Sequence, residues 1–99
     1  MPYVPEKIRL LYKDTIDNFE NMHAEKASAG EVTFLITALI HSWIKKQKWC
    51  YLTFCIAVGI LVCCILELYR KVVAPYEDKK RMDCGGVSEL DQITMEETR

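Results

Sequence analysis

The sequence predicts an all-α membrane protein with one transmembrane helix at about 49–69, preceded by an amphipathic or interfacial helix pair and followed by a flexible charged tail. Three observations predict this class. The stretch Trp49–Leu66 has no charged side chain, and before it apolar residues recur at helical spacing. After it come a proline, a charged run and two glycines. The chain therefore divides into segments 1–27, 28–47, 48–71 and 72–99.

The first segment, residues 1–27, is predicted to be an amphipathic helix. Its apolar residues follow one another at steps of three and four, and Pro5 suits a first helical turn. The polar face mixes both charge signs, which favours packing on a partner protein over a purely electrostatic role at a membrane surface. The alternative is that this face covers a neighbouring helix of the same chain. The candidate partner-packing residues are Ile8, Leu11, Phe19 and Met22.

The second segment, residues 28–47, has a clear start signal. Ser28 is followed three residues later by Glu31, which is the capping-box arrangement, so we expect a helix to begin near Ala29. Residues 32–44 carry no charge, but at about 20 Å this stretch is short for crossing hydrocarbon. We expect an interfacial or partner-packed helix. It either continues into the next segment as one rod, bends near Lys45, or forms a two-span hairpin beginning around Ala27.

The third segment, residues 48–71, contains the predicted transmembrane helix. Trp49–Leu66 would be about 27 Å long as a helix, and its Leu, Ile, Val and Phe residues contribute roughly −3 to −5 kcal/mol of insertion free energy. The lipid bilayer is therefore the first expected partner. The alternative is a buried core helix of a soluble protein, but the remaining chain is short and polar for wrapping it. Aromatic residues flank both ends, as expected at two membrane interfaces: Trp43, Trp49, Tyr51, Tyr69 and Tyr76.

The charges around the predicted span bear on its orientation. Three lysines precede it, and five basic residues follow it within the distance that matters for topology. This weak excess favours a C-terminus on the cytosolic side, or on the matrix side in mitochondria. The first residues lack the apolar core of a secretory signal, so we expect the span to act as its own insertion signal. The endomembrane system and the mitochondrial inner membrane both remain open as locations.

One ridge of the predicted span carries small side chains in its middle. Tyr51, Cys55, Gly59, Cys63 and Glu67 follow one another at four-residue steps. In lipid, close approach of helix backbones at small residues drives helix association, so this ridge is the candidate helix–helix packing surface. Glu67 is either neutralised by Arg70 and Lys71 on its own helix or paired with a basic group on the partner.

The last segment, residues 72–99, is predicted to be a largely disordered polar tail. We expect Pro75 and the charges that follow it to end the preceding helix. Ser88 and Thr94 each precede an acidic residue by three positions and are candidate phosphorylation sites. Cys64 and Cys84 are candidate palmitoylation sites.

These features favour some function classes over others. No nucleophile stands with a base and an orienting acid, and no metal-ligand spacing is present, so we expect no enzyme, cofactor or metal site. There is no continuous basic face for nucleic acid. We expect a small accessory or regulatory subunit of a larger multi-pass membrane protein or complex. The alternatives are a bitopic scaffold whose tail recruits soluble partners on phosphorylation, and a single-pass protein that forms homodimers.

Overall fold

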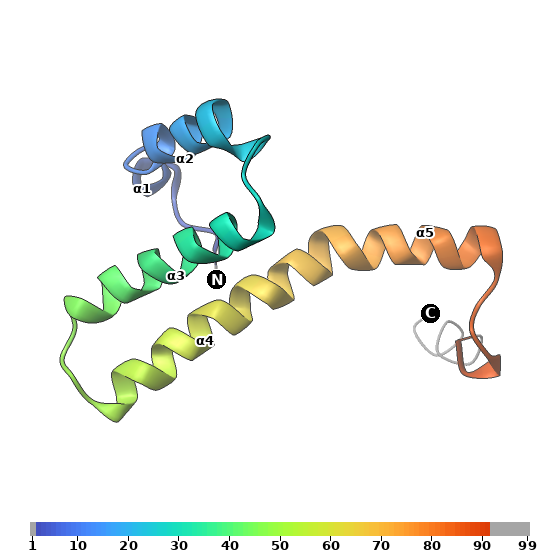
Figure 1. The fold of residues 1–99 in the computed structure, drawn as a ribbon. Coiled ribbons are helices and arrows are strands. Elements are labelled where there is room, and N and C mark those ends of the chain that lie inside the picture. The colour runs from blue at the N-terminus through green and yellow to red at the C-terminus, as the bar shows by residue number, and fades with distance from the viewer. Residues whose placement is uncertain (1, 92–99) are drawn as a thin grey trace. The chain divides into compact units, whose positions relative to one another are not determined.

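In a computed structural model of the protein, residues 2–91 are described and form helices and turns without any strand (Figure 1). The all-helical prediction is confirmed for this part of the chain. The chain divides into two compact units, Met1–Val62 and Cys63–Arg99. The helical elements are α1 (Glu6–Arg9), α2 (Lys13–Phe19), the π-helix η1 (Glu20–Ala24), α3 (Ala29–Lys45), α4 (Tyr51–Leu68), the π-helix η2 (Tyr69–Val73) and α5 (Ala74–Cys84).

The N-terminal segment is not the single helix that its apolar spacing predicts. Between α1 and α2, the amide of Leu11 donates to the carbonyl of Ile8, and the amide of Tyr12 donates to that of Arg9. These bonds span three residues, as in a 3₁₀-helix, and interrupt the α-helical pattern. The Arg9 side chain also bonds back to the carbonyl of Val4 at 2.8 Å. No glycine or proline marks this break, so apolar spacing alone gave no signal for it.

Helix α3 begins where the capping box predicts. The Ser28 hydroxyl accepts a hydrogen bond from the amide of Glu31 at 3.1 Å, and the Glu31 carboxylate accepts one from the amide of Ser28 at 3.0 Å. Two backbone donors that the helix leaves unsatisfied are therefore paired. The helix starts at Ala29, in agreement with the sequence.

Helices α3 and α4 are separate, so of the three alternatives left open by the sequence the continuous rod is not the one observed. At the end of α3, the amides of Lys46 and Gln47 bond to carbonyls three residues back, which tightens the last turn. The Thr53 hydroxyl then donates to the carbonyl of Lys48 at 2.6 Å and ties the start of α4 to the turn. Local hydrogen bonds thus place the bend at 46–50, without glycine or proline.

In the second unit, the helix continues past Pro75, and the prediction that it ends there is wrong (Figure 1). The π-helix η2 directly precedes Pro75, and the amide of Ala74 bonds to the carbonyl of Tyr69, five residues back. A wider turn at this place accommodates a residue that has no amide hydrogen and whose ring crowds the preceding turn. Residues 72–84 of the expected disordered tail are therefore helical.

Helix α5 ends at a glycine. Gly85 has a φ of 89°, in the left-handed region that favours this residue, and its amide bonds to the carbonyl of Arg81 at 2.8 Å. The amide of Leu90 then bonds to the Ser88 hydroxyl at 3.2 Å. The predicted break at Gly85 is confirmed.

Candidate functional site

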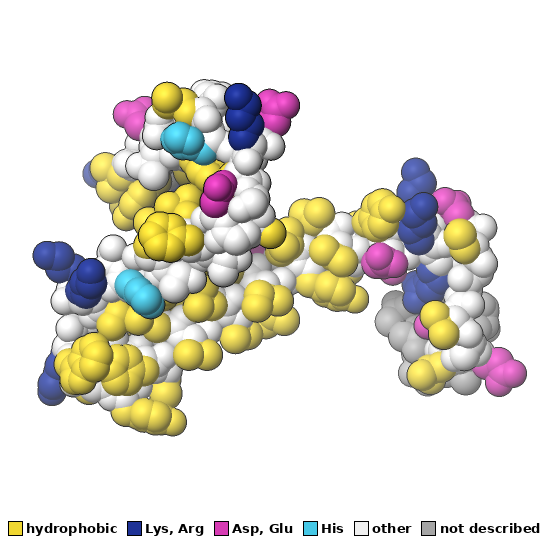
Figure 2. Space-filling view, viewed as in Figure 1, with side chains coloured by type: hydrophobic (Ala, Val, Ile, Leu, Met, Phe, Trp, Pro, Cys, Tyr) yellow, Lys and Arg dark blue, Asp and Glu magenta, His cyan; other side chains and the backbone are white. Residues whose placement is uncertain are grey.

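Helix α4 is the most apolar element of the described chain. It lies in the one described helical run, Tyr51–Cys84, that is long and apolar enough to cross a membrane. Most of its large side chains are exposed, and hydrophobic surface gathers along it (Figure 2). A single soluble copy would present this surface to water, which is costly for so many contiguous apolar groups. The helix therefore requires lipid or protein around it.

One face of α4 is covered within the first unit. Thr53 and Ala57 are the buried residues of the helix, at 6% and 5% exposure, and they lie one turn apart. The Thr53 hydroxyl is paired with the carbonyl of Lys48, so no unsatisfied donor is buried there. Small side chains on this face are thus already used for contacts inside the chain.

The predicted packing ridge lies on the other side of α4. Cys55 and Gly59 each follow a buried residue by two positions, which is about 200° around the helix axis. Tyr51 and Cys55 are exposed, and a side chain added at Gly59 would have no atom within 4 Å. This part of the ridge is therefore open, and nothing in the first unit requires a glycine at position 59.

The remaining ridge residues, Cys63 and Glu67, lie on the part of α4 that belongs to the second unit. Cys63 is half-buried. The Glu67 carboxylate forms an ion pair with the Arg70 guanidinium, with nitrogen–oxygen distances of 2.9 and 3.2 Å. Of the two interpretations offered by the sequence, the intrachain pair is therefore present.

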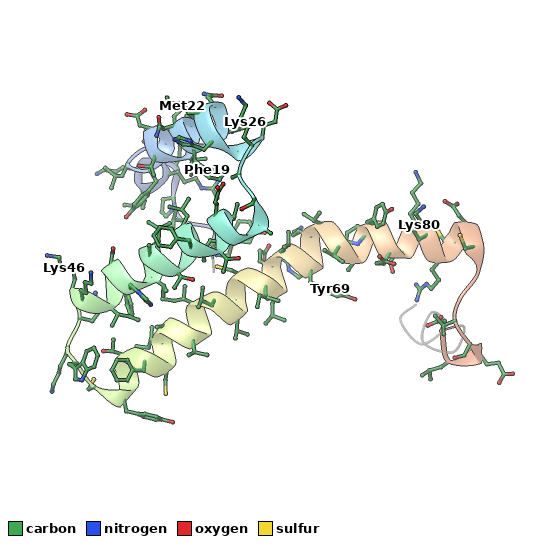
Figure 3. All side chains as sticks on the ribbon, in the orientation of Figure 1. Phe19, Met22, Lys26, Lys46, Tyr69 and Lys80 are labelled. Atoms are coloured by element: carbon green, nitrogen blue, oxygen red, sulfur yellow. The ribbon has the colours of Figure 1, made fainter. Side chains whose placement is uncertain are left out.

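The four residues predicted to form a partner-packing face do not share one helix. Ile8 is on α1, Leu11 is in the turn after it, Phe19 ends α2, and Met22 is in η1. Phe19 is half-buried, whereas Leu11 and Met22 are 71% and 68% exposed. Phe19 and Met22 are labelled in Figure 3. The break at residues 10–12 and the π-turn of η1 change the register, so the predicted stripe is not continuous.

The candidate modification sites differ in their surroundings. Cys64 and Cys84 are exposed free thiols, on α4 and at the end of α5 respectively. The Ser88 hydroxyl is exposed and accepts the hydrogen bond from Leu90. Thr94 lies outside the described residues.

The turn between α3 and α4 has an open cavity that the sequence did not predict. It has a volume of about 290 Å³, and a T-shaped ring contact between Trp49 and Phe54, with centroids 4.8 Å apart, forms part of its wall. The remaining lining residues come from the last turns of α3: His41, Ile44 and Lys45. The sequence signal was present around positions 43–49, but the tryptophans were interpreted as an interfacial belt and the lysines as evidence on the orientation of the span.

Comparison with known proteins adds a family but no activity. In residues 2–91, no group of three His, Cys, Asp or Glu side chains is placed to hold a metal ion. No curated protein and no solved structure matches the chain. Residues 1–87 match a family described as a domain of unknown function (DUF6899), and because this match covers most of the chain, the protein belongs to that family.

Proposed function

We propose that the protein is a small, non-catalytic accessory or regulatory subunit that spans a membrane through α4 and docks on a larger multi-pass membrane protein. The observation that carries this proposal is the contrast between the two faces of α4. Thr53 and Ala57 are buried, whereas the ridge with Cys55 and Gly59 on the other side is open. Small residues on an open ridge favour close packing against another helix in lipid.

The first step of this function is insertion of α4 as a single span. Its 18 residues give a length of about 27 Å. A helix of this length crosses a thin bilayer without tilting, or a bilayer of average thickness that thins slightly around it. The Glu67–Arg70 ion pair lies near its C-terminal end, where both side chains extend into the interface. Membrane residence predicts that the protein stays with vesicles in alkaline carbonate. Release into the soluble fraction would contradict it.

Helix α3 is proposed to lie in the interface or against the partner. In residues 32–44 it carries no charge, and Thr33 and Ser42 donate their hydroxyl hydrogens to the carbonyls of Ala29 and Ala38 at 2.8 and 3.0 Å. These bonds satisfy the hydroxyl donors without water. The helix therefore suits an apolar environment, although it is shorter than α4.

The orientation and location of the proposed subunit follow from charge. The excess of Lys and Arg after the span favours a cytosolic C-terminus, or a matrix C-terminus in mitochondria. Protease protection of tags at residues 1 and 99 tests this orientation. Both the endomembrane system and the mitochondrial inner membrane are consistent with the proposal.

The docking proposal is tested by Gly59→Leu. Because the space at Gly59 is open, leucine is tolerated by the chain itself, but it keeps a neighbouring helix from approaching closely. In mild detergent we expect the variant to lose most of the membrane protein that co-purifies with the unaltered chain. Val58→Leu, on an exposed neighbouring position, is the matched control.

Three experiments distinguish the proposed function from its alternatives. Unchanged co-purification in Gly59→Leu would contradict docking through the ridge. Homodimers trapped by a thiol crosslinker at Cys55, with no second protein recovered, would favour self-association over a subunit role. Loss of a soluble partner on deletion of residues 85–99, with the membrane partner retained, would favour the scaffold function.

A further inference from the structure

The turn between α3 and α4 combines three positive charges with an apolar cavity. Lys45 lines the cavity, and Lys46 and Lys48 follow it in the sequence. Lys46 is labelled in Figure 3. Within the described part of the chain, none of the three lysines forms an ion pair. The sequence has no acidic residue between Glu31 and Glu67, so no carboxylate lies close to these lysines along the chain. The positive charge of this turn is uncompensated.

The cavity itself is apolar and lies next to these charges. Ile44, Trp49 and Phe54 contribute its aliphatic and aromatic walls, and His41 contributes an imidazole. Its volume of about 290 Å³ is near the lower end of ligand pockets, so it takes part of an acyl chain rather than a whole lipid. An apolar wall beside an ammonium group matches a molecule with a hydrocarbon chain and a negative headgroup.

The turn is held in one shape by hydrogen bonds. The Thr53 hydroxyl fixes the carbonyl of Lys48, and the amides of Lys46 and Gln47 bond to the end of α3. The lysines therefore project from a fixed backbone beside the cavity rather than from a loose linker. At the start of a membrane span, this position coincides with the level of the lipid headgroups.

We propose that this turn binds an anionic phospholipid, with the phosphate between the lysines and part of one acyl chain in the cavity. The inference rests on the proposed membrane insertion of α4, because only then does the turn lie at the headgroup level. Each lysine near the membrane surface raises the affinity for anionic lipid by roughly fivefold. The site is separate from the open ridge with Cys55 and Gly59.

Trp49 is a reporter for this site because it lines the cavity and is one of only two tryptophans. The full chain with Trp43→Phe is reconstituted in vesicles of phosphatidylcholine and phosphatidylglycerol, with brominated acyl chains on one lipid at a time. Fluorescence quenching of Trp49 then gives the relative association constant of the two lipids. We expect phosphatidylglycerol to be preferred by at least about fivefold, which is the effect of a single lysine.

Two triple variants separate a local site from general electrostatics. K45Q/K46Q/K48Q should bring the preference to about one, since it removes the charges that hold the phosphate. K71Q/K79Q/K80Q removes the same charge beyond the other end of α4 and should leave the preference unchanged. No preference in the Trp43→Phe chain, or an equal loss in both triple variants, would overturn the proposal.

Two further experiments test whether the bound phosphate belongs to a lipid and whether an acyl chain occupies the cavity. Inorganic phosphate should not displace the lipid, and displacement would show an anion site rather than a lipid site. Ile44→Gln keeps the lysines but places a polar group in the cavity, so quenching of Trp49 fluorescence by bromine on the acyl chain should fall. Unchanged quenching would contradict binding of the acyl chain in the cavity. Carbonate extraction is done in parallel, so that failed insertion is distinguished from an inserted protein without lipid preference.

Discussion

The two ends of helix α4 differ in how the chain leaves them. Before α4 the chain turns through residues 46–50, and Lys45, Lys46 and Lys48 at this end form no ion pair within residues 2–91. After α4 the helix continues through η2 and α5, and ion pairs join Glu67 to Arg70 and Asp78 to Arg81. The first end therefore offers charge to a ligand outside the chain, whereas the second end balances part of its charge internally.

The difference shows that helix boundaries depend on side-chain hydrogen bonds as much as on helix-breaking residues. At residues 46–50 the chain bends without glycine or proline, and Thr53 bonds to the carbonyl of Lys48. At Pro75 the helix is preserved because the π-turn η2 precedes it. This arrangement gives α4 a sharp start and a helical continuation beyond its end.

The largest expected effect is the loss of insertion when a charge is placed in the middle of α4. Val58→Arg should cost about 2.5–3.5 kcal/mol of insertion free energy, a large share of what the span supplies. Val72→Arg, in η2, is the matched control because both valines are about equally exposed, at 62% and 60%. Carbonate extraction should release the first variant and retain the second. Equal retention of both would show that α4 is not the span.

The next effect concerns the continued helix after the span. Pro75→Ala restores an amide donor, so the π-turn should revert to regular α-helical bonding and the helix should gain up to about 3 kcal/mol in local stability. Amide hydrogen exchange of residues 69–79 measures this gain. Unchanged protection, with the π-turn retained, would show that Pro75 is not its cause.

A smaller effect is expected at the turn before the span. Thr53→Val removes the hydroxyl that holds the carbonyl of Lys48 and should cost about 1 kcal/mol of local stability. Faster amide exchange at residues 48–52 would show this loss. Thr33→Val is the control, because its hydroxyl bonds within α3 at an exposed position. Similar exchange in the two variants would contradict a special role for Thr53.

The sequence predicted the elements that depend on local chemistry. Ser28 and Glu31 specify the start of α3 through direct hydrogen bonds, and the charge-free stretch specifies the apolar helix. It did not predict the break at Leu10–Tyr12 or the helix beyond Pro75, because both depend on backbone hydrogen bonds to residues three or five positions away. Residue spacing alone does not distinguish these patterns from a regular α-helix.

The packing function of the ridge on α4 stays a prediction, and only its place on the helix is described by the structure. Four-residue spacing places the ridge residues on one side of α4, and the structure locates Cys55 and Gly59 on the open side. The cavity at the turn was missed because Phe54 joins Trp49 only after the chain bends. The sequence was compatible with a bend near Lys45, with one continuous helix and with a two-span hairpin, and no residue pattern distinguished these three alternatives.

The smallest expected effect concerns Glu67, which lies on the predicted ridge but pairs with Arg70. An exposed ion pair contributes about 0.2–1 kcal/mol, so Glu67→Gln should reduce recovery of the membrane partner far less than Gly59→Leu. The swapped variant E67R/R70E restores an intrachain pair with reversed charges and should recover the partner as well as the unaltered chain. If Glu67→Gln and the swap both abolish recovery, Glu67 pairs with a basic residue of the partner, and the C-terminal end of α4 also offers charge outside the chain.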